Sequence, residues 1–206
     1  MYDMIKLSFI PSPEIRQLRN LIRCRVKLTN MLTGEKSRVQ NCLLVSNLKL
    51  DDVFSDVFGK SSRSITNYRL DHPGETFLVA PFVDVRCKTP LEEIQTAVDG
   101  ALSPVQALKL RQYLAHNNKL EAHRKKIEQE ILKIAELFST VLDPLYPLPG
   151  FDKNSMTAIA ILSDIGPDMS VFPSSKRLIS WAGCCPRNDQ SNKRIKSRHV
   201  SLAGSY

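Results

Sequence analysis

The stretch of residues between Ser103 and Leu142 constrains the fold most, because one set of mostly apolar residues recurs there at alternating intervals of three and four. That spacing is the seam of a coiled-coil helix, and a proline directly after Ser103 is typical of a helix's first turn. Three seam members are polar, which a coiled coil tolerates because buried polar groups set register and partner number at some cost in stability. The predicted seam consists of Gln106, Leu110, Tyr113, Asn117, Leu120, Arg124, Ile127, Ile131, Ile134, Phe138 and Val141.

A second long helix is predicted to start at Pro13. Ser12 supplies a capping hydroxyl, and Glu14 supplies a carboxylate near the positive end of the helix dipole. Gly34 should weaken this helix without ending it, since apolar positions continue beyond it. The seam described above packs on this helix, on another copy of the protein, or on both. The apolar stripe of the helix is Ile15, Leu18, Leu21, Ile22, Leu28 and Leu32, and the neighbouring cationic stripe is Arg16, Arg19, Arg23 and Lys27.

Proline and glycine divide the chain and indicate a mainly α fold. Thr89 and Pro90 begin a helix that Gly100 stops, and prolines at 144, 147 and 149 end the coiled-coil helix. We expect four parts: an N-terminal basic helix with two short helices over 1–70, an irregular connector with room for one short strand over 71–90, coiled-coil helices over 91–143, and a small helical C-terminal domain over 144–206.

Positive charge is concentrated toward both ends of the chain, whose net charge is +8. Residues 14–38 carry seven basic and two acidic groups, and residues 176–206 carry seven and one. Residues 39–175 hold fourteen basic against seventeen acidic groups. A polyanion that contacts two separated basic patches explains this distribution, and so do solvated basic faces without a ligand. We favour nucleic acid as the partner.

Several classes of protein and site are disfavoured. No apolar run has the length of a membrane span, and the first ten residues, with Asp3, fit neither a secretory signal nor a transit peptide, so we expect a cytoplasmic protein. The five cysteines lack the spacing of a zinc site, the four histidines are scattered, and no glycine-rich phosphate loop is present. Helix-end capping explains Asp164 and Asp168 better than a metal does. We predict neither a metal site nor a cofactor in this chain.

The start of the C-terminal domain has a pattern that suits a DNA backbone contact. Gly150 lies in a turn before a helix that Gly166 ends, as in a helix-hairpin-helix, where free amides at the second helix's N-terminus hold a phosphate. Asp152 stands where that motif usually has its second glycine, and a carboxylate there caps the amides instead. An ordinary turn between packed helices explains the pattern equally well.

A cation-rich loop follows the only tryptophan, and Ser191 lies at its junction. A serine attacks a phosphodiester when its proton can leave and cations stabilise the charge on phosphorus. Spacing alone also fits a solvated loop hydroxyl at Ser191. The cations that we expect to contact nucleic acid here are Arg187, Lys193, Arg194, Lys196 and Arg198. We expect further contacts from Arg16, Arg19 and Arg23 near the N-terminus and from Gly150 at the turn.

The segment 178–197 (LISWAGCCPRNDQSNKRIKS) resembles the C-terminal signature of the insertion-sequence 110, 116 and 902 family of transposases. Further stretches agree with the family in the same order: 8–25 (SFIPSPEIRQLRNLIRCR), 54–61 (FSDVFGKS) and 148–172 (LPGFDKNSMTAIAILSDIGPDMSVF). Together these four segments extend over nearly the whole chain.

The resemblance implies DNA transposition by strand transfer through a covalent serine intermediate. The matching serine is Ser191. Family members carry an N-terminal domain whose four acidic residues bind magnesium, then a coiled coil, then the domain with the serine. They are guided by a structured RNA and assemble as multimers. We therefore expect DNA, a guide RNA and a second copy of this chain, associated through the coiled coil, as partners.

The chain departs from the family in extent and in one motif. Its first matching segment lies after the last of the family's acidic residues, so the magnesium site is expected to be missing, and the family's chain continues beyond Tyr206. Asn192 and Lys193 replace the small residue and the glycine that usually follow the serine. Two hypotheses follow: a transposase segment that keeps its nucleophile, or a catalytically inert remnant, truncated at both ends, that only binds nucleic acid or oligomerises.

Overall fold

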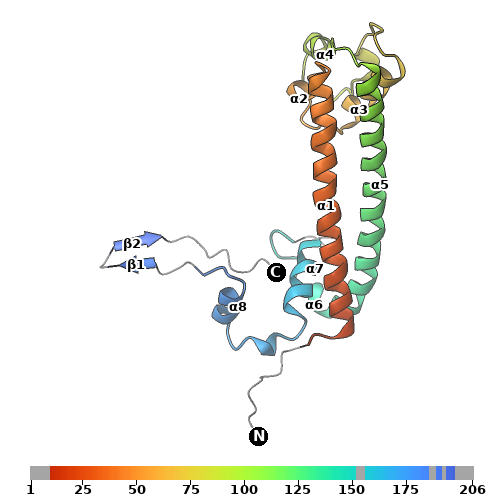
Figure 1. Cartoon of the computed structure of the whole chain (residues 1–206). Coiled ribbons are helices and arrows are strands. Elements are labelled where there is room, and N and C mark those ends of the chain that lie inside the picture. Colours follow the sequence, from red (N-terminus) through yellow and green to blue (C-terminus); the bar gives the residue numbers. More distant parts are fainter. Residues whose placement is uncertain (1–9, 152–155, 186–188, 192–193, 198–206) are drawn as a thin grey trace. The chain divides into compact units, whose positions relative to one another are not determined.

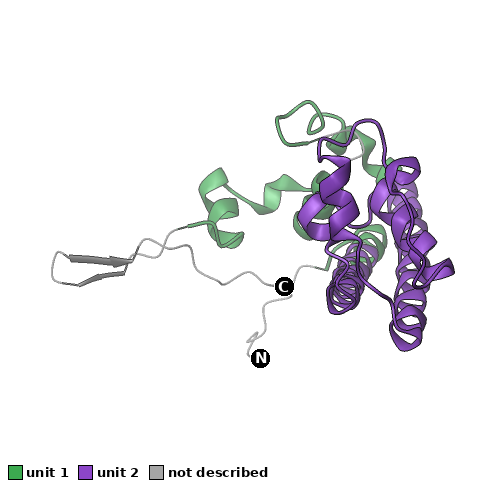
Figure 2. Ribbon diagram, turned by 90° about the horizontal axis from the view of Figure 1, so that it is seen from above, with its two compact units in different colours: residues 1–19, 135–206 green, residues 20–134 purple. Residues whose placement is uncertain are grey.

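The computed structural model describes residues 10–151, 156–185, 189–191 and 194–197. These residues form two compact units, shown in different colours in Figure 2: unit 1 is residues 1–19 with 135–206, and unit 2 is residues 20–134. Most of the described residues are helical, which confirms the mainly α prediction. The predicted division into four parts stays a prediction.

Unit 2 contains most of two long helices, α1 (Pro13–Val45) and α5 (Pro104–Ala135), and the first turns of α1 belong to unit 1. They run side by side and antiparallel (Figure 1), since Arg25 of α1 contacts Glu128 of α5 and Cys42 contacts Gln106. Gly34 does not interrupt α1, as predicted. Both helices begin at a Ser-Pro pair, and the Ser103 hydroxyl accepts a hydrogen bond from the Gln106 amide at 3.3 Å.

The coiled-coil seam of α5 is packed within the chain. Leu110 and Ile131 are fully buried, and the polar seam member Asn117 is fully buried as well. The seam helix is shorter than predicted, because the 3₁₀ turn η2 (Glu136–Phe138) separates α5 from the short helix α6 (Ser139–Leu142). Association of two copies through the coiled coil stays a prediction.

Four short elements pack at the end of unit 2 where α1 ends and α5 begins. They are α2 (Leu50–Val53), α3 (Lys60–Asp71), the 3₁₀ turn η1 (Ala80–Phe82) and α4 (Leu91–Ala97). The two short helices predicted before residue 70 are therefore present. The predicted connector, residues 71–90, is irregular as expected, but the turn η1 stands where we allowed a short strand. The core that these elements share includes Val39, Leu43, Leu48, Leu50, Ile65, Val79, Ile94, Val98 and Leu110.

Hydrogen bonds of a buried arginine and a close backbone approach at a glycine hold this end of unit 2 together. The buried Arg69 guanidinium donates to the carbonyl of Glu75 at 2.7 Å and to that of Val98 at 2.6 Å, so α3 is tied both to the connector and to the end of α4. A Cβ at Gly100 would lie 2.2 Å from the carbonyl oxygen of Ser46. Only glycine permits this close approach of the chain to the end of α1.

Unit 1 contains α6, α7 (Met156–Ile165), the 3₁₀ turn η3 (Met169–Val171), α8 (Ser175–Trp181) and two short strands, β1 (Asp189–Ser191) and β2 (Arg194–Ser197). Among the described residues, its buried apolar side chains are Ile15, Leu18, Ala135, Leu142, Ala158, Ile159 and Leu162. The helices agree with the prediction of a small helical C-terminal domain, to which the two strands are an addition. The strands fall in the polar stretch that we predicted to be a loop, where no alternation of apolar residues indicates a strand.

Candidate nucleic-acid interface

Ser191 lies at the end of a β-hairpin. It is the last residue of β1 and pairs with Arg194, the first residue of β2. The pairing is antiparallel, and it continues through Gln190 with Ile195 and Asp189 with Ser197, with a register shift between Asp189 and Gln190. The backbone therefore brings the predicted nucleophile position next to one predicted cation. Lys196 also lies on β2, whereas Arg187, Lys193 and Arg198 lie outside the described residues.

The helix that precedes the hairpin is terminated by local backbone bonds. The Ala182 amide bonds to the carbonyl of Leu178 at 2.8 Å, and Gly183, at φ +70°, takes the left-handed conformation that ends many helices. The ring of Trp181, at the end of α8, contacts the ring of Phe172 edge-on, with centroids 5.6 Å apart. This aromatic pair joins the segment before α8 to the end of that helix.

The turn before α7 contains Gly150 at φ +89°, in the left-handed region that favours glycine. Helices lie on both sides of this turn, as the helix-hairpin-helix hypothesis requires, but α6 has only four residues. Asp152 and the three residues after it lie outside the described part of the chain. The phosphate-binding role of the turn stays a prediction.

Arg19 is held by the C-terminal end of α7. Its Nε donates to the carbonyl of Ser163 at 3.0 Å, its Nη2 donates to the carbonyl of Asp164 at 3.3 Å, and the Asp164 carboxylate lies 3.9 Å away. Carbonyl groups at a helix C-terminus carry partial negative charge and lack partners, so they favour a cation. Arg19 thus stabilises unit 1, whereas Arg16 and Arg23, also predicted to contact nucleic acid, are exposed on α1.

The two carboxylates around Gly166 have separate roles. Asp168 caps η3, because its side chain accepts from the Ser170 amide at 2.9 Å. Hydrogen bonds from the side chain and the amide of Ser170 lower the pKa of Asp168. Asp164 pairs with Arg19. Within the described residues, no three histidine, cysteine, aspartate or glutamate side chains gather as metal ligands would. No helix in that part of the chain is both long and apolar enough to cross a bilayer.

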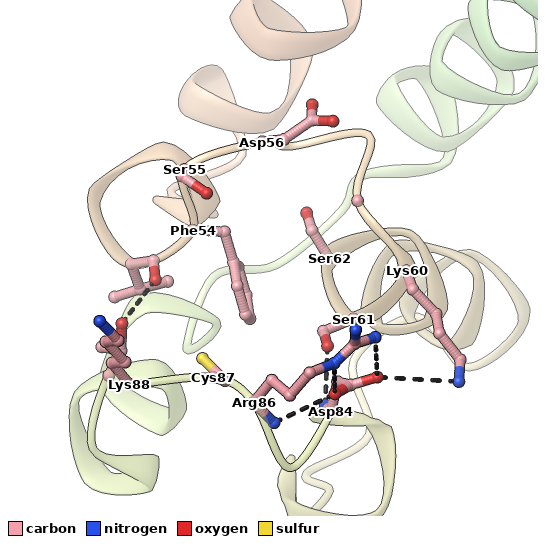
Figure 3. Close-up of a pocket in the computed structure, with 13 residues that line it drawn as sticks. Phe54, Ser55, Asp56, Lys60, Ser61, Ser62, Asp84, Arg86, Cys87 and Lys88 are labelled. Carbon is pink, nitrogen blue, oxygen red and sulfur yellow. Dashed lines mark hydrogen bonds and ion pairs between the residues drawn. The ribbon is translucent and has the colours of Figure 1, made fainter.

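One pocket of unit 2 was not predicted from the sequence (Figure 3). It lies between the start of α3 and the segment 84–89, and it brings together Lys60, Ser62, Arg86 and Lys88. One side of the pocket has a signal in the sequence: α3 starts after Gly59, a residue that has no side chain to cap the helix. The other side comes from a connector with no regular pattern, so its contribution depends on tertiary packing.

Residues 145–205, which include α7, α8 and the hairpin, match the family model described as the transposase IS116/IS110/IS902 family. Comparisons with curated proteins and with solved structures found no match. The matched segment carries the turn at Gly150 and the strand that ends at Ser191. This part of the chain is thus similar to a segment of a DNA transposase. The family that this segment matches is the IS116/IS110/IS902 family.

Proposed function

We propose that this chain takes part in DNA transposition by strand transfer, with Ser191 as the nucleophile. The observation that carries the proposal is the position of Ser191 beside Arg194 at the end of the hairpin, inside the segment that matches the transposase family. Backbone pairing puts a serine and an arginine at facing positions of the hairpin. A serine hydroxyl can attack a phosphodiester where a cation stabilises the charge that develops on phosphorus.

The proposed chemistry is an exchange of phosphodiester bonds. The Ser191 oxygen forms a bond to phosphorus and loses its proton, while the bond from phosphorus to a sugar oxygen breaks and that oxygen is protonated. A sugar hydroxyl of the target strand then attacks the serine-linked phosphorus, and the serine hydroxyl is regenerated. The number of phosphodiester bonds is conserved, so the exchange needs neither an oxidant nor an energy-rich co-reactant.

Nucleic-acid binding is proposed to rest on the basic groups near Ser191 and on exposed cations of α1. The C-terminal cations are Arg187, Lys193, Arg194, Lys196 and Arg198, and those of α1 are Arg16 and Arg23. We further propose DNA and a structured guide RNA as the bound molecules, and a second copy of the chain as a partner. Magnesium, which the family resemblance assigns to an acidic domain, is proposed to act from a separate domain.

The covalent intermediate tests the nucleophile. The full chain is incubated with element-end DNA, guide RNA and magnesium, with and without an intact acidic domain added in trans, and run on a denaturing gel. We expect a protein-linked DNA band only when the acidic domain is present, and its loss in Ser191→Ala. Ser197→Ala, a change of the same kind in the same hairpin, is the matched control and should keep the band. No band in any arm would favour the inert alternative.

A further inference from the structure

The pocket of unit 2 has a volume of about 530 Å³ and is lined by two segments far apart in the sequence. One comprises residues 53–56 with the start of α3, and the other is the loop 84–89. Phe54 forms part of its wall, and Ser62 points its hydroxyl into the space beside that ring (Figure 3). The volume suits a nucleotide-sized group, since small-molecule sites span roughly 300–1,000 Å³.

The N-terminus of α3 lines this pocket without a cap. Gly59 occupies the N-cap position and has no side chain to accept from the first amides of the helix. The first amide that bonds back along the chain is that of Arg63, to the carbonyl of Gly59 at 2.9 Å. The amides of Lys60, Ser61 and Ser62 are therefore donors without an acceptor from the helix itself, and a helix of twelve residues adds its dipole.

Ser62 gives an independent sign of a missing ligand. Its side chain is only 1% exposed, and its Oγ has no hydrogen-bond partner. Leaving a buried hydroxyl unpaired costs free energy, so such groups are rare in native proteins. Its neighbour Ser61, on the same turn, accepts from the Asp84 amide at 2.8 Å and so has a structural role. A ligand with acceptor atoms would satisfy Ser62.

The charges around the pocket favour an anion. Lys60, Arg86 and Lys88 line it, against the carboxylates of Asp56 and Asp84. Asp84 already accepts from Arg86 at 3.1 Å and lies 3.8 Å from Lys60. Asp56 accepts from the amide of Phe58, and its oxygens point away from Ser62 (Figure 3). One positive charge is left over, in addition to the positive end of α3.

We propose that this pocket binds a phosphate of a nucleic-acid strand, with the phosphate oxygens on the first amides of α3 and on the Ser62 hydroxyl. Lys88 supplies the counter-charge at its rim, since Arg86 is already paired with Asp84. This inference deepens the proposed function, because the ligand is the same polymer, but the contact lies in unit 2 and involves no residue of the transposase-matched segment. A strand held here would be positioned by its backbone and not read by its sequence.

The site is tested by amide shifts in the full, isotope-labelled chain. The probes are inorganic phosphate and a short single-stranded thymidine oligonucleotide, and duplex DNA binding is measured in parallel. We expect the oligonucleotide to shift the amide resonances of Lys60, Ser61 and Ser62. Shifts caused by inorganic phosphate alone would overturn the nucleic-acid ligand, and no shift with either probe would overturn the site.

A pair of neighbouring serine variants separates binding from folding. Ser62→Ala should weaken oligonucleotide affinity about tenfold, the effect of losing one hydrogen bond to a charged group. It should leave thermal stability unchanged or raised, because it removes an unpaired buried hydroxyl. Ser61→Ala should lower stability instead, because it removes the acceptor for the Asp84 amide. If Ser62→Ala lowers stability and leaves affinity unchanged, the hydroxyl is structural and the proposal fails.

Charge reversal at the rim gives a second measurement that does not depend on a buried residue. Lys88→Glu should weaken oligonucleotide binding, and Lys119→Glu, an exposed lysine of α5, should not. The experiments distinguish a failure of the pocket from a failure of the proposed function. If duplex DNA binds but the α3 amides never respond, this site is wrong and the proposed function survives. If the amides respond but Arg194→Glu with Lys196→Glu leaves duplex binding unchanged, the C-terminal contact is wrong and the pocket survives.

Discussion

Arg25 and Glu128 join the two long helices of unit 2, with the Arg25 Nε 2.8 Å from Glu128 Oε1. Both side chains are largely covered, at 27% and 23% exposure, so the pair is better shielded from water than a surface ion pair. Arg25→Ala should lower the free energy of unfolding by about 1–2 kcal/mol, between the values for exposed and buried pairs. Urea denaturation measures the change. Arg23→Ala, an exposed arginine on the same helix, is the control and should have almost no effect.

Asn117 should be replaceable by leucine with a gain in stability. Its side chain is fully buried in the seam of α5, and neither its Oδ1 nor its Nδ2 has a hydrogen-bond partner. Asn117→Leu should raise the free energy of unfolding by about 1–2 kcal/mol, because an apolar side chain of similar size removes two unpaired groups. Thermal unfolding measures this. A loss of stability would show that water pairs the amide.

Two glycines should respond in opposite directions to replacement by alanine. At Gly100 the added Cβ would lie 2.2 Å from the Ser46 carbonyl oxygen, so the backbone must move, and we expect a loss of at least about 2 kcal/mol. At Gly34, inside α1, the added Cβ meets nothing within 4 Å. Gly34→Ala should stabilise the protein by about 1 kcal/mol, the difference in helix propensity. Equal effects of the two changes would contradict the packing of Gly100.

The carboxylate of Asp84 should make part of the stability depend on acid pH. Hydrogen bonds from Arg86 lower the pKa of Asp84 in the folded protein. Its contribution is therefore fully present above the ordinary carboxyl pKa and is lost as the pH falls through the lowered folded value. The stability difference between the natural protein and Asp84→Asn should shrink as the pH is lowered from about 6 to below about 3. A constant difference over this range would show that the charge of Asp84 contributes nothing.

Nucleic-acid affinity should fall steeply with salt, because each neutralised phosphate releases counterions. Titrating duplex DNA and structured RNA at two salt concentrations gives the slope. Arg194→Ala and Lys196→Ala should each reduce that slope by about 1, if each contacts one phosphate. Lys119→Ala should leave the slope unchanged. Binding that does not depend on salt would overturn the assignment of these cations.

Self-association also stays open to measurement. The seam of α5 is covered within the chain, so Ile127→Asp with Ile134→Asp would disturb the folded monomer as well as any contact between copies. Sedimentation should therefore be run on the natural chain over a range of concentrations first. We expect a mass above that of the monomer that falls on dilution. A monomer at every concentration would limit the coiled coil to packing within one chain.

The sequence by itself determined the features that depend on neighbours along the chain. The Ser-Pro starts predicted α1 and α5, the three-and-four spacing predicted the seam of α5, and a Thr-Pro start with a glycine stop predicted α4. Helix capping and helical periodicity act over a few residues, so the sequence shows them directly. The match of residues 145–205 to a transposase family likewise confirmed what the string around Ser191 had indicated. The hairpin at Ser191 was missed, because a polar stretch shows no alternation that would indicate strands.

Only the tertiary structure decided which distant segments meet. It placed the seam of α5 on α1 of the same chain, and it buried Asn117 there. It also brought Ser62 beside the loop 84–89, which no pattern in the sequence connects to α3. Such contacts depend on how the short elements between α1 and α5 pack around one apolar core. Residues that line a pocket from separate segments share no spacing, so their proximity arises only when the core has formed.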